Sequence, residues 1–544
     1  MKNGIYPYYE IPEIEISRQL VEYGKQSNDD KPFLYTKTGG SITSAEFSDL
    51  VKECATYLLS EGLRKANIGL LGENSNEWCL AYFSIINSGN VVVPLDRNLN
   101  SEEIVGLLER CECKAVIYSE KDKDLIAKAD REKIIFLSLN EMDAYCEKGR
   151  NLLKEGDRSY EETIIDKDDL AAIVFTSGTS GTMKGVMLSQ KNLMSDAVAC
   201  CRHVVEHDTQ IFLPLHHTFP WAAAMFGIFL CGGTMRFSPN MKRLMKDLKN
   251  NHPQNISAVP LMVETLYNGI WNSARKNGQE TRLKKAISLS RFLMAFGIDA
   301  RKKLFKEIHD SFGGKLEVII CGGAPLDEDV ERGFYDLGIQ VINGYGITEC
   351  SPVVAVNRPH DFRFGSVGKV LPCNKVRIID PDKDGIGEVL VKGSNVMKGY
   401  YKDPEATAEA FEDEWFRTGD FGKIDKDGFL FITGRKKNLI VLSNGENVSP
   451  EEIENKLIKL PYVKEVAVYE EDREIVGEFY LDEDAFSEAR KMLENDVDFY
   501  NRSVPNYKNI GKIKVRTIPF EKTTTMKIKR YLLKKEKEEE STSS

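Results

Sequence analysis

One loop concentrates side chains that suit a polyphosphate. Residues 175–185 read FTSGTSGTMKG and follow an apolar run, 170–175, which predicts a buried strand. Glycines let the backbone approach a ligand closely with its N–H groups turned inward, and a lysine adds positive charge. The loop supplies five hydroxyl side chains, three glycines and one lysine: Thr176, Ser177, Thr179, Ser180, Thr182, Gly178, Gly181, Gly185 and Lys184.

The spacing of this loop differs from that of a Walker P-loop. The Walker motif has four residues between its glycines and a Ser or Thr after its lysine. Here two residues separate Gly178 from Gly181, and Gly185 follows Lys184. The sequence therefore predicts a phosphate-binding loop of another class. The alternative is a flexible surface loop of low complexity.

Two further glycine-rich segments also follow strand-like runs. Residues 321–326 (CGGAPL) follow the run 318–320, and residues 343–349 (NGYGITE) follow the run 339–342. Ligands in open α/β sheets bind at the carboxyl ends of the strands. We therefore expect both segments to share one crevice with the hydroxyl-rich loop.

The residue types in the NGYGITE segment suit a nucleoside triphosphate. Tyr345 offers a flat face to a purine, and Thr348 offers a hydroxyl to a phosphate. Glu349 is a hard oxygen ligand suited to Mg²⁺, which accompanies nucleoside triphosphates. Taken alone, Glu349 would be an acidic residue at a helix start, and its neighbours favour the metal.

Three charged residues farther along the chain could complete a nucleotide site. Asp420 ends the segment WFRTGD, and a carboxylate can accept both ribose hydroxyls. Arg435 could reach the same ribose or a phosphate. Lys527 lies on a polar loop and could enter a site as a movable positive charge. Each residue also has a simpler interpretation, as a turn aspartate or a surface side chain.

The elements that must position these residues alternate between strand and helix patterns. Residues 67–72, 91–94, 115–118 and 134–137 predict strands, and 78–87 predict a helix. This alternation indicates an α/β fold with largely parallel sheets. The polar residues 141–167 are expected to form a surface connection.

The composition changes near Gly434. Ser449, Pro450 and Glu452 form a capping-box pattern with proline at the first helical position. The helix is predicted to end near Lys459, and 463–469 predict a strand. These elements indicate a small C-terminal α+β domain.

Composition limits the class of protein. The chain of 544 residues is too long for one core, and its net charge of −10 gives no general case for nucleic acid. Eleven cysteines without a CxxC pair indicate free thiols in a reducing cytosol. The apolar run 221–231 is too short to span a bilayer. A cytoplasmic enzyme is expected, peripheral membrane contact stays open, and the sequence does not predict the oligomeric state.

Four motifs occur in the order found in one family. The hydroxyl-rich loop, GYGITE, WFRTGD with GRKKNLI, and the late lysine together resemble the adenylate-forming superfamily of acyl-CoA synthetases, nonribosomal adenylation domains and luciferases. The resemblance covers roughly residues 30–532. The segments LSNGENVSPEEIE and GYGITECSPVV look most like bacterial long-chain acyl-CoA synthetases.

This resemblance implies a two-step ligase that uses ATP, Mg²⁺ and CoA. A carboxylate attacks the α-phosphate of ATP to give acyl-AMP and pyrophosphate, and a thiol then displaces AMP. Catalytic roles are implied for Lys527, Glu349 and His217, with Glu349 as the metal ligand. Nucleotide binding is implied for the loop residues Thr176, Ser177, Gly178, Thr179, Ser180, Gly181, Thr182 and Lys184, and for Gly323, Ala324, Pro325, Asn343, Gly344, Tyr345, Gly346, Thr348, Asp420 and Arg435.

The resemblance also implies domain alternation and an acyl site. It suggests an N-terminal domain over 1–433, a hinge at 434–438 centred on Lys437, and a mobile lid over 439–544. Gly445 would lie on the lid face used in the thiol step. His217 and Trp221 would border the acyl pocket, beside the small residues 222–224.

Three positions depart from the family pattern. Met183 replaces a proline before the loop lysine, Met526 replaces a glycine before Lys527, and Asn438 replaces an aspartate beside the hinge. No charged catalytic group is lost, so activity is expected.

The sequence predicts an ATP-dependent ligase for a medium- or long-chain fatty acid with CoA as the acceptor. A ligase that loads an acyl carrier protein is one alternative, because both acceptors present the same thiol. A nucleotide-binding module without turnover is another.

Overall fold

The computed structural model describes residues 9–36, 39–177, 183–204, 207–441, 447–471, 473–522, 528–530 and 532–533. Contacts divide the chain into two compact units. Unit 1 comprises the described residues up to 177, those from 183 to Lys375, and Lys392–Glu414. Unit 2 comprises Val376–Val391 and the described residues from Trp415 onward.

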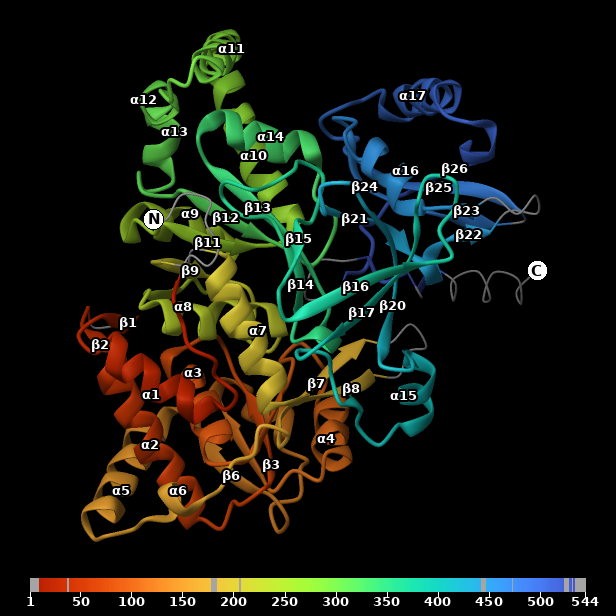
Figure 1. Cartoon of the computed structure of the whole chain (residues 1–544). Coiled ribbons are helices and arrows are strands. Elements are labelled where there is room, and N and C mark those ends of the chain that lie inside the picture. The colour runs from red at the N-terminus through yellow and green to blue at the C-terminus, as the bar shows by residue number, and fades with distance from the viewer. Residues whose placement is uncertain are drawn as a thin grey trace. The chain divides into compact units, whose positions relative to one another are not determined.

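A seven-stranded sheet forms one layer of unit 1 (Figure 1). Its strand order is β18-β8-β7-β4-β3-β5-β6. Strands β7, β4, β3, β5 and β6 are parallel, whereas β8 is antiparallel to both β7 and β18. The strands are β3 (Asn67–Leu71), β4 (Val91–Pro94), β5 (Ala115–Tyr118), β6 (Ile135–Ser138), β7 (Leu170–Ser177), β8 (Met183–Ser189) and β18 (Gly399–Tyr400).

A nine-stranded sheet forms the second layer of unit 1. Its order is β15-β14-β13-β12-β11-β9-β10-β1-β2, with a parallel centre and antiparallel pairs at both edges. The strands are β1 (Pro32–Tyr35), β2 (Ser41–Thr43), β9 (Thr209–Ile211), β10 (Met235–Phe237), β11 (Asn255–Ala258), β12 (Val318–Cys321), β13 (Gln340–Gly346), β14 (Val353–Val356) and β15 (Lys369–Val370).

Helices flank both sheets. The α-helices of unit 1 are α1 (Ser17–Ser27), α2 (Ser44–Ser60), α3 (Asn76–Asn87), α4 (Ser101–Arg110), α5 (Met142–Lys154), α6 (Ser159–Glu162), α7 (Gln190–His203), α8 (Phe226–Cys231), α9 (Met241–Asn251), α10 (Pro260–Lys276), α11 (Glu280–Ala295), α12 (Arg301–Leu304), α13 (Lys306–Ser311), α14 (Glu328–Leu337) and α15 (Pro404–Ala410). Short 3₁₀ turns are η1 (Glu120–Ile126), η2 (Leu139–Glu141) and η4 (Thr348–Cys350), while η3 (Phe219–Met225) is a π-helix and β19 (Phe411–Glu412) a short strand.

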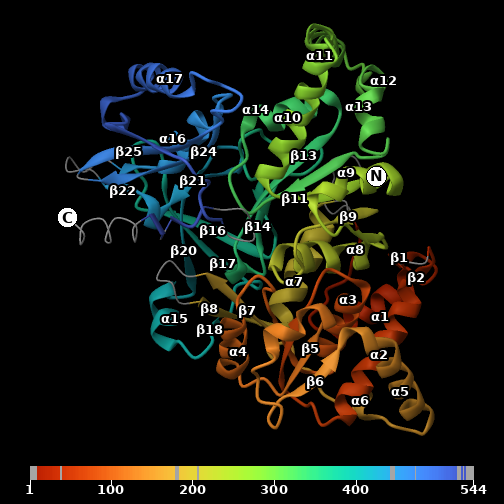
Figure 2. The same ribbon diagram turned by 180° about the vertical axis from the view of Figure 1, so that it is seen from behind.

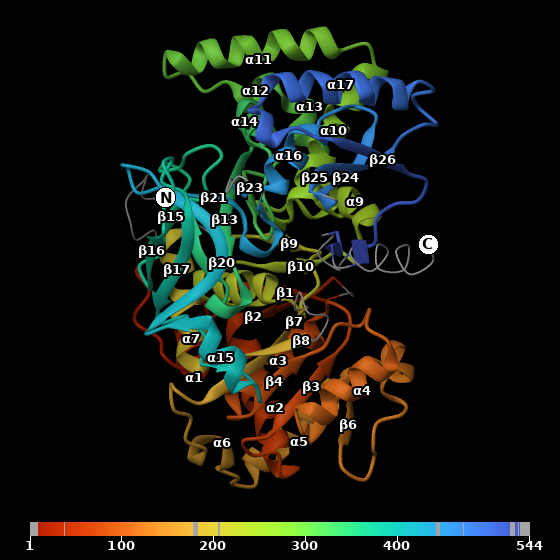
Figure 3. The ribbon, with the colours of Figure 1, turned by 90° about the vertical axis from the view of Figure 1, so that its right-hand side faces the viewer.

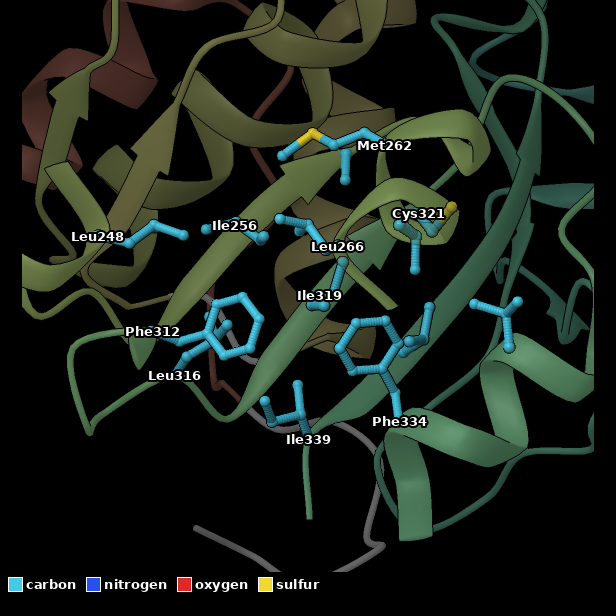
Figure 4. Close-up of a cluster of buried hydrophobic side chains, with 14 of the residues drawn as sticks. Leu248, Ile256, Met262, Leu266, Phe312, Leu316, Ile319, Cys321, Phe334 and Ile339 are labelled. Carbon is cyan, nitrogen blue, oxygen red and sulfur yellow. The ribbon is translucent and has the colours of Figure 1, made fainter. Parts of the chain in front are cut away.

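One apolar core holds the nine-stranded sheet against α10 and α14 (Figure 4). Ile256 of β11 and Ile319 of β12 face Leu266 of α10 and Phe334 of α14. All four side chains are at most 7% exposed. Burying an aliphatic or aromatic side chain of this size contributes about 1.5–3 kcal/mol, so this core fixes where β12 and β13 end.

Unit 2 contains most of a five-stranded sheet and a small α+β body. Strands β16 (Asn374–Ile379), β17 (Gly387–Gly393), β20 (Trp415–Ile424) and β21 (Leu430–Arg435) lie in that order, and β20 is antiparallel to β17 and β21. The α+β body holds a three-stranded sheet with two helices and a short hairpin. Its elements are β22 (Ile440–Val441), β23 (Asn447–Val448), α16 (Pro450–Leu457), β24 (Val463–Glu471), β25 (Glu474–Leu481), α17 (Ala489–Ser503) and β26 (Lys512–Arg516), with 3₁₀ turns η5 (Lys436–Asn438) and η6 (Asn506–Lys508).

The predicted α/β class, with mixed, mostly parallel sheets and a smaller α+β part, is confirmed. The predicted strands over 91–94 and 115–118 match β4 and β5 without a shift. No helix among the described residues is long and apolar enough to cross a membrane.

The prediction of a surface connection over 141–167 is wrong. Residues Met142–Lys154 form α5, which lies beside α2 at the edge of unit 1 (Figure 2). A Cβ atom at Gly149 would lie 1.8 Å from the carbonyl oxygen of Glu53. The backbones of the two helices therefore approach closely at this glycine. Because few residues on the buried face of α5 are large and apolar, the sequence shows only a weak helical pattern there.

The capping box at the start of α16 is also absent. The helix does begin at Pro450, as predicted, but the Ser449 hydroxyl makes no capping bond to the helix. Instead its Oγ donates to the Thr433 carbonyl oxygen at 2.9 Å, and it lies 3.0 Å from the Glu451 carboxylate. Tertiary partners have taken the hydroxyl away from the helix end.

A buried carboxylic acid on α14 gives the stability of the protein a defined pH dependence. Glu331 is 1% exposed, and one of its oxygens accepts the Gly365 N–H at 3.0 Å. Burial raises the pKa of Glu331 to about 7, although the Gly365 N–H opposes the rise. The stabilising contribution is therefore complete below the ordinary pKa of 4.5 and is lost as the pH rises through 7.

Replacing Glu331 by Gln should flatten this dependence, because the amide cannot ionise. Between pH 4.5 and 8 the wild type should lose about 3 kcal/mol of unfolding free energy relative to Glu331→Gln. Denaturant titrations at several pH values would measure it. Glu307→Gln, which changes an exposed acid on α13, is the matched control and should leave the slope unchanged. Parallel pH profiles for wild type and Glu331→Gln would contradict the assignment.

Candidate active site

The predicted phosphate loop joins two antiparallel strands. Thr176 and Ser177 end β7, and Met183 and Lys184 begin β8. Thr176 pairs with Lys184, and Ser177 with Met183. The hairpin register therefore fixes the two ends of the loop. Gly178, Thr179, Ser180, Gly181 and Thr182, which the sequence assigned to nucleotide binding, lie outside the described residues.

Lys184 and Glu349 both contact the side chain of Tyr400. The Lys184 Nζ lies 4.7 Å from the centre of the Tyr400 ring, and the Tyr400 hydroxyl donates to Glu349 Oε1 at 3.0 Å. Burial, followed by the negative charge of Glu349, raises the pKa of Tyr400, so its hydroxyl stays protonated. The three side chains place a cation and an anion beside each other without joining them in a direct ion pair.

A buried polar network holds the backbone of Glu349. Its carbonyl oxygen accepts the Met397 N–H at 2.8 Å, and Ser351 Oγ donates to the Asn395 carbonyl oxygen at 2.8 Å. The Asn395 amide in turn donates to Asp196 of α7 at 3.0 Å. Asp196 is fully buried, and burial raises its pKa well above the ordinary value. Buried, hydrogen-bonded groups of this kind position a turn rigidly.

The end of β12 lies beside the middle of β13, at the points where the two glycine-rich segments begin. Cys321 pairs with Asn343, and a Cβ atom at Gly322 would lie 3.5 Å from the Gly344 carbonyl oxygen. Gly323 has φ of +91°, a conformation that favours glycine, and it leads into Ala324 and Pro325. The first residues of the two segments predicted to bind a nucleotide are therefore neighbours.

The prediction that residues 343–346 form a loop after the strand is wrong. Asn343, Gly344, Tyr345 and Gly346 belong to β13, which continues by pairing with β14. A Cβ atom at Gly346 would lie 2.3 Å from the Pro352 carbonyl oxygen. The glycines thus serve close packing of two strands as well as any ligand. Tyr345 is only 8% exposed, so little of its ring is accessible.

Asn343 is held by a second network that reaches Glu331. Its side-chain nitrogen donates to the Ser366 carbonyl oxygen at 3.3 Å, and the Ser366 hydroxyl lies 3.3 Å from Asn357 Oδ1. The neighbouring Gly365 N–H bonds to Glu331. The segment that positions Asn343 is therefore anchored to α14.

His217 lies at the end of a turn fixed by its neighbours. His216 Nε2 is 3.4 Å from Asp96 Oδ1, and the rings of His216 and His217 are 4.2 Å apart. Burial alone would raise the pKa of Asp96, but the nearby His216 lowers it. The next residue, Thr218, lies 3.4 Å from Thr348 between their hydroxyl oxygens. The structure thus brings the His217 turn next to the Thr348–Glu349 turn.

Trp221 is fully buried within the π-helix η3. Its ring lies 4.8 Å from that of Tyr82 and 5.8 Å from that of Phe226. Within the described part of the chain its indole N–H has no hydrogen-bond partner, and neither has the Tyr82 hydroxyl. Single-turn π-helices occur often at functional sites. Ala222 and Ala224, predicted to leave space for an acyl chain, are at most 2% exposed and pack with this cluster.

Unit 2 holds the predicted ribose-binding pair. Asp420 of β20 pairs in register with Arg435 of β21, and Arg435 Nε lies 2.9 Å from Asp420 Oδ1. The Asp420 side chain is only 4% exposed, whereas that of Arg435 is 54% exposed. Sequence reasoning named both residues separately, and the strand register joins them.

The predicted hinge contains one departure from the family pattern that the structure explains. Lys437 lies in η5 and is exposed. Next to it, the Asn438 amide donates to Glu451 Oε1 at 2.6 Å. An aspartate at this position would place two carboxylates together, so the amide fits its partner.

Gly445 and Lys527 lie outside the described residues, but the base of the Lys527 loop is described. Lys522 and Ile528 form an antiparallel bridge. Three residues after Lys527, Arg530 lies 2.5 Å from Glu454 of α16. Burial raises the pKa of Glu454, and the charge of Arg530 opposes that rise. This partly buried pair connects the described residues after the loop to α16.

Sequence reasoning missed several residues that position the site. Tyr400, Asp96 and Asp196 belong to no motif or spacing pattern that points to a ligand. Tyr400 follows a glycine in the segment MKGYY, a weak sign of a tight approach. These residues position the site through partners that are far away in the sequence, and the local sequence around each residue does not indicate those partners.

Comparison with known proteins agrees with this geometry. The family model described as "AMP-binding enzyme" matches residues 21–401. The chain belongs to this family. A second model, "AMP-binding enzyme C-terminal domain", matches residues 437–540. The chain is therefore an adenylate-forming enzyme of the acyl-CoA ligase type, and the family recognised from the motifs is confirmed.

Relatives and solved structures resemble this family member along most of its length. A long-chain-fatty-acid–CoA ligase of Mycobacterium bovis is 28% identical, over 90% of each chain. A chloroplastic long-chain-fatty-acid–[acyl-carrier-protein] ligase of Arabidopsis thaliana is 30% identical, over 77% of this chain and 70% of its own. ATP-bound MatB from Rhodopseudomonas palustris has 26% identity and a TM-score of 0.76, over 95% of this chain and 98% of its own.

Removing the Tyr400 hydroxyl should impair the ligase without unfolding it. Tyr400→Phe keeps the ring beside Lys184 but loses the hydrogen bond to Glu349, a bond to a charged group worth about 1.5–3 kcal/mol. We expect kcat/KM for acid-dependent pyrophosphate release to fall by about tenfold or more. Tyr401→Phe, at the next residue, is the control and should retain activity. Equal activity of wild type and Tyr400→Phe would show that Glu349 does not need this partner.

Proposed function

We propose that this ligase activates a medium- or long-chain fatty acid and transfers it to CoA. The carboxylate oxygen attacks the α-phosphorus of ATP, and the bond to pyrophosphate breaks to leave acyl-AMP. The CoA sulfur then attacks the acyl carbonyl carbon, and AMP leaves with the electrons of the broken C–O bond. The thiol gives up its proton during this second step.

The arrangement of Lys184, Tyr400 and Glu349 carries the proposal. A positive and a negative side chain both contact Tyr400, and Lys184 lies in a hairpin whose sequence is rich in hydroxyl residues. Nucleotidyl transfer depends on positioning and charge neutralisation more than on covalent help from the protein. Lys184 and the hairpin loop would neutralise the β- and γ-phosphates, which leave together as pyrophosphate.

Glu349 fits a magnesium ion that arrives with ATP. Tyr400 engages one of its oxygens, and no group of three or more His, Cys, Asp or Glu side chains suited to a metal occurs in the described ranges. Mg²⁺ is commonly held by one or two carboxylates together with substrate phosphates and water. Such an ion would supply charge neutralisation at the phosphates.

The adenosine would lie against Gly323, Ala324, Pro325 and Asn343. The Asn343 amide is a polar group suited to the edge of a purine. Because Tyr345 is almost buried, we infer that it contacts the base with an edge or a small part of its face. Thr348 would offer its hydroxyl to a phosphate.

The remaining roles fall to unit 2. Asp420 would accept the ribose hydroxyls, with Arg435 orienting its carboxylate. Lys527 would stabilise charge that develops between the acid and the α-phosphate. We propose residues 434–438 as a hinge centred on Lys437, between an N-terminal domain over 1–433 and a mobile domain over 439–544. Rotation of that domain would replace Lys527 by the face carrying Gly445 for the thiol step.

His217 and Trp221 would border the fatty acid. The cluster around Trp221 is apolar except for its indole N–H and the Tyr82 hydroxyl, which supports a hydrocarbon chain as the ligand. The relatives' names support a long-chain acid for the same reason.

A carrier protein is the second candidate for the acceptor. One relative is a ligase for an acyl carrier protein, and a carrier protein presents the same phosphopantetheine thiol as CoA. The first half-reaction would be unchanged.

An acid screen tests the proposed function. The full chain, with ATP and Mg²⁺, should release pyrophosphate with medium- or long-chain fatty acids and make a thioester when CoA is added. Release with every fatty acid but thioester only with a holo carrier protein would identify the second acceptor. If the protein binds nucleotide but none of the acids causes pyrophosphate release, the ligase proposal is refuted and a binding module without turnover is supported.

Lys527→Ala should separate the two half-reactions. Loss of the positive charge should reduce adenylation by about a hundredfold or more, while thioester formation from supplied acyl-AMP should persist. Lys529→Ala, two residues away and in a partly exposed pair with Glu521, is the control and should retain both rates. Equal loss in both half-reactions would contradict the role given to Lys527.

A further inference from the structure

An exposed apolar stripe runs along α11 and the turn after it. Leu289, Phe292, Phe296 and Ile298 are 47%, 60%, 69% and 54% exposed. The rings of Phe292 and Phe296 lie 5.0 Å apart, so they form one continuous patch. Large apolar side chains are rarely this exposed in a contiguous group unless they bind something.

The stripe follows from the spacing of the helix. Leu289, Phe292 and Phe296 are separated by three and four residues, so they share one face. The opposite face packs on unit 1, where Ser290 is 2% exposed and Arg291 lies 2.6 Å from Asp336 of α14. Figure 3 shows α11 along the outer edge of unit 1, beyond α12 and α14. Because the opposite face of α11 packs on unit 1, the apolar stripe points away from unit 1.

The same face is basic at its other end. Arg282 and Lys285 continue the stripe at the same spacing, toward the N-terminus of α11. Residues 280–306 contain eight Lys and Arg but only two acidic residues, although the whole chain carries a net charge of −10. Within the described ranges Arg282, Lys285 and Lys303 form no ion pair, whereas Arg291, Arg301, Lys302 and Lys306 are each paired with an acid.

We propose that this face docks on the surface of an anionic phospholipid bilayer. Phe292, Phe296 and Ile298 would enter the interface, while Arg282 and Lys285 would face the lipid headgroups. A helix of 16 residues is about 24 Å long and suits a position in the plane of the interface. Basic residues beside exposed apolar ones are attracted to anionic lipids.

A second copy of the chain is a poorer occupant. In a two-fold interface the same patch of both copies is in contact. The basic end of one copy would then lie near the basic end of the other, or against the apolar stripe of the other. A bilayer rich in anionic headgroups instead complements that charge along the whole face. The proposal concerns a surface and does not depend on which acid the ligase activates.

Vesicle sedimentation of the full chain, without ATP, acid or CoA, tests the proposal. The wild type should pellet with vesicles of equal parts phosphatidylglycerol and phosphatidylcholine, and far less with phosphatidylcholine alone. The double substitution Phe292→Ser and Phe296→Ser should lower the partition coefficient at least about tenfold. Arg282→Glu with Lys285→Glu should do the same at low salt, with a smaller difference at high salt.

The matched control is Phe499→Ser with Lys154→Glu, which changes an equally exposed aromatic residue and a surface lysine elsewhere. It should bind vesicles like the wild type, and all variants should keep their melting temperatures. Equal sedimentation of the stripe variants and the control would overturn the proposal. So would absence of wild-type binding, or stripe variants that change only the oligomeric state or only the binding of a holo carrier protein. Because no substrate is present, either result leaves the ligase assignment to its own test.

Discussion

The hydrogen bond from Tyr400 to Glu349 is the contact that links the two charged side chains of the candidate site in unit 1. It ties the turn after β13 to the edge strand β18, and β18 in turn pairs with the strand that carries Lys184. The donor of this bond is buried, and its acceptor is charged. A hydrogen bond to a charged group in a low-dielectric setting is stronger and more directional than one in water. One tyrosine therefore sets the distance between the positive and negative sides of the site.

Buried polar networks extend this constraint outward from the tyrosine. Asp196 on α7 holds Asn395, and Glu331 on α14 holds the Gly365 segment beside Asn343. Each carboxyl group is buried, where a charge without partners would be costly, and one oxygen of each accepts backbone or amide N–H groups. The site is thus supported by groups that titrate and that only one arrangement of the surrounding segments satisfies. Unit 2 also contains a carboxyl group with a fixed partner, because Glu454 forms an ion pair with Arg530, three residues after Lys527.

The sequence was a reliable guide where local pattern and tertiary role coincide. Short apolar runs such as 91–94 and 115–118 became central parallel strands because both of their faces are buried. It misled where a tertiary partner overrides a local preference. The NGYG segment looks like a loop because glycines favour turns, yet β14 supplies a pairing partner and keeps it extended. The α5 segment looks like a polar connection because its packing face on α2 depends on Gly149 rather than on large apolar side chains.

The sequence by itself determined the family, the order of the motifs, and the charged residues that a nucleotide needs, because these depend on residue types at fixed spacings along the chain. Only the tertiary structure decided that Tyr400 joins Lys184 to Glu349, that Asp420 lies against Arg435, and that an apolar and basic face of α11 points outward. Such pairings bring together residues separated by up to hundreds of positions. They are fixed by strand register and helix packing, which the neighbouring sequence does not encode at any single position.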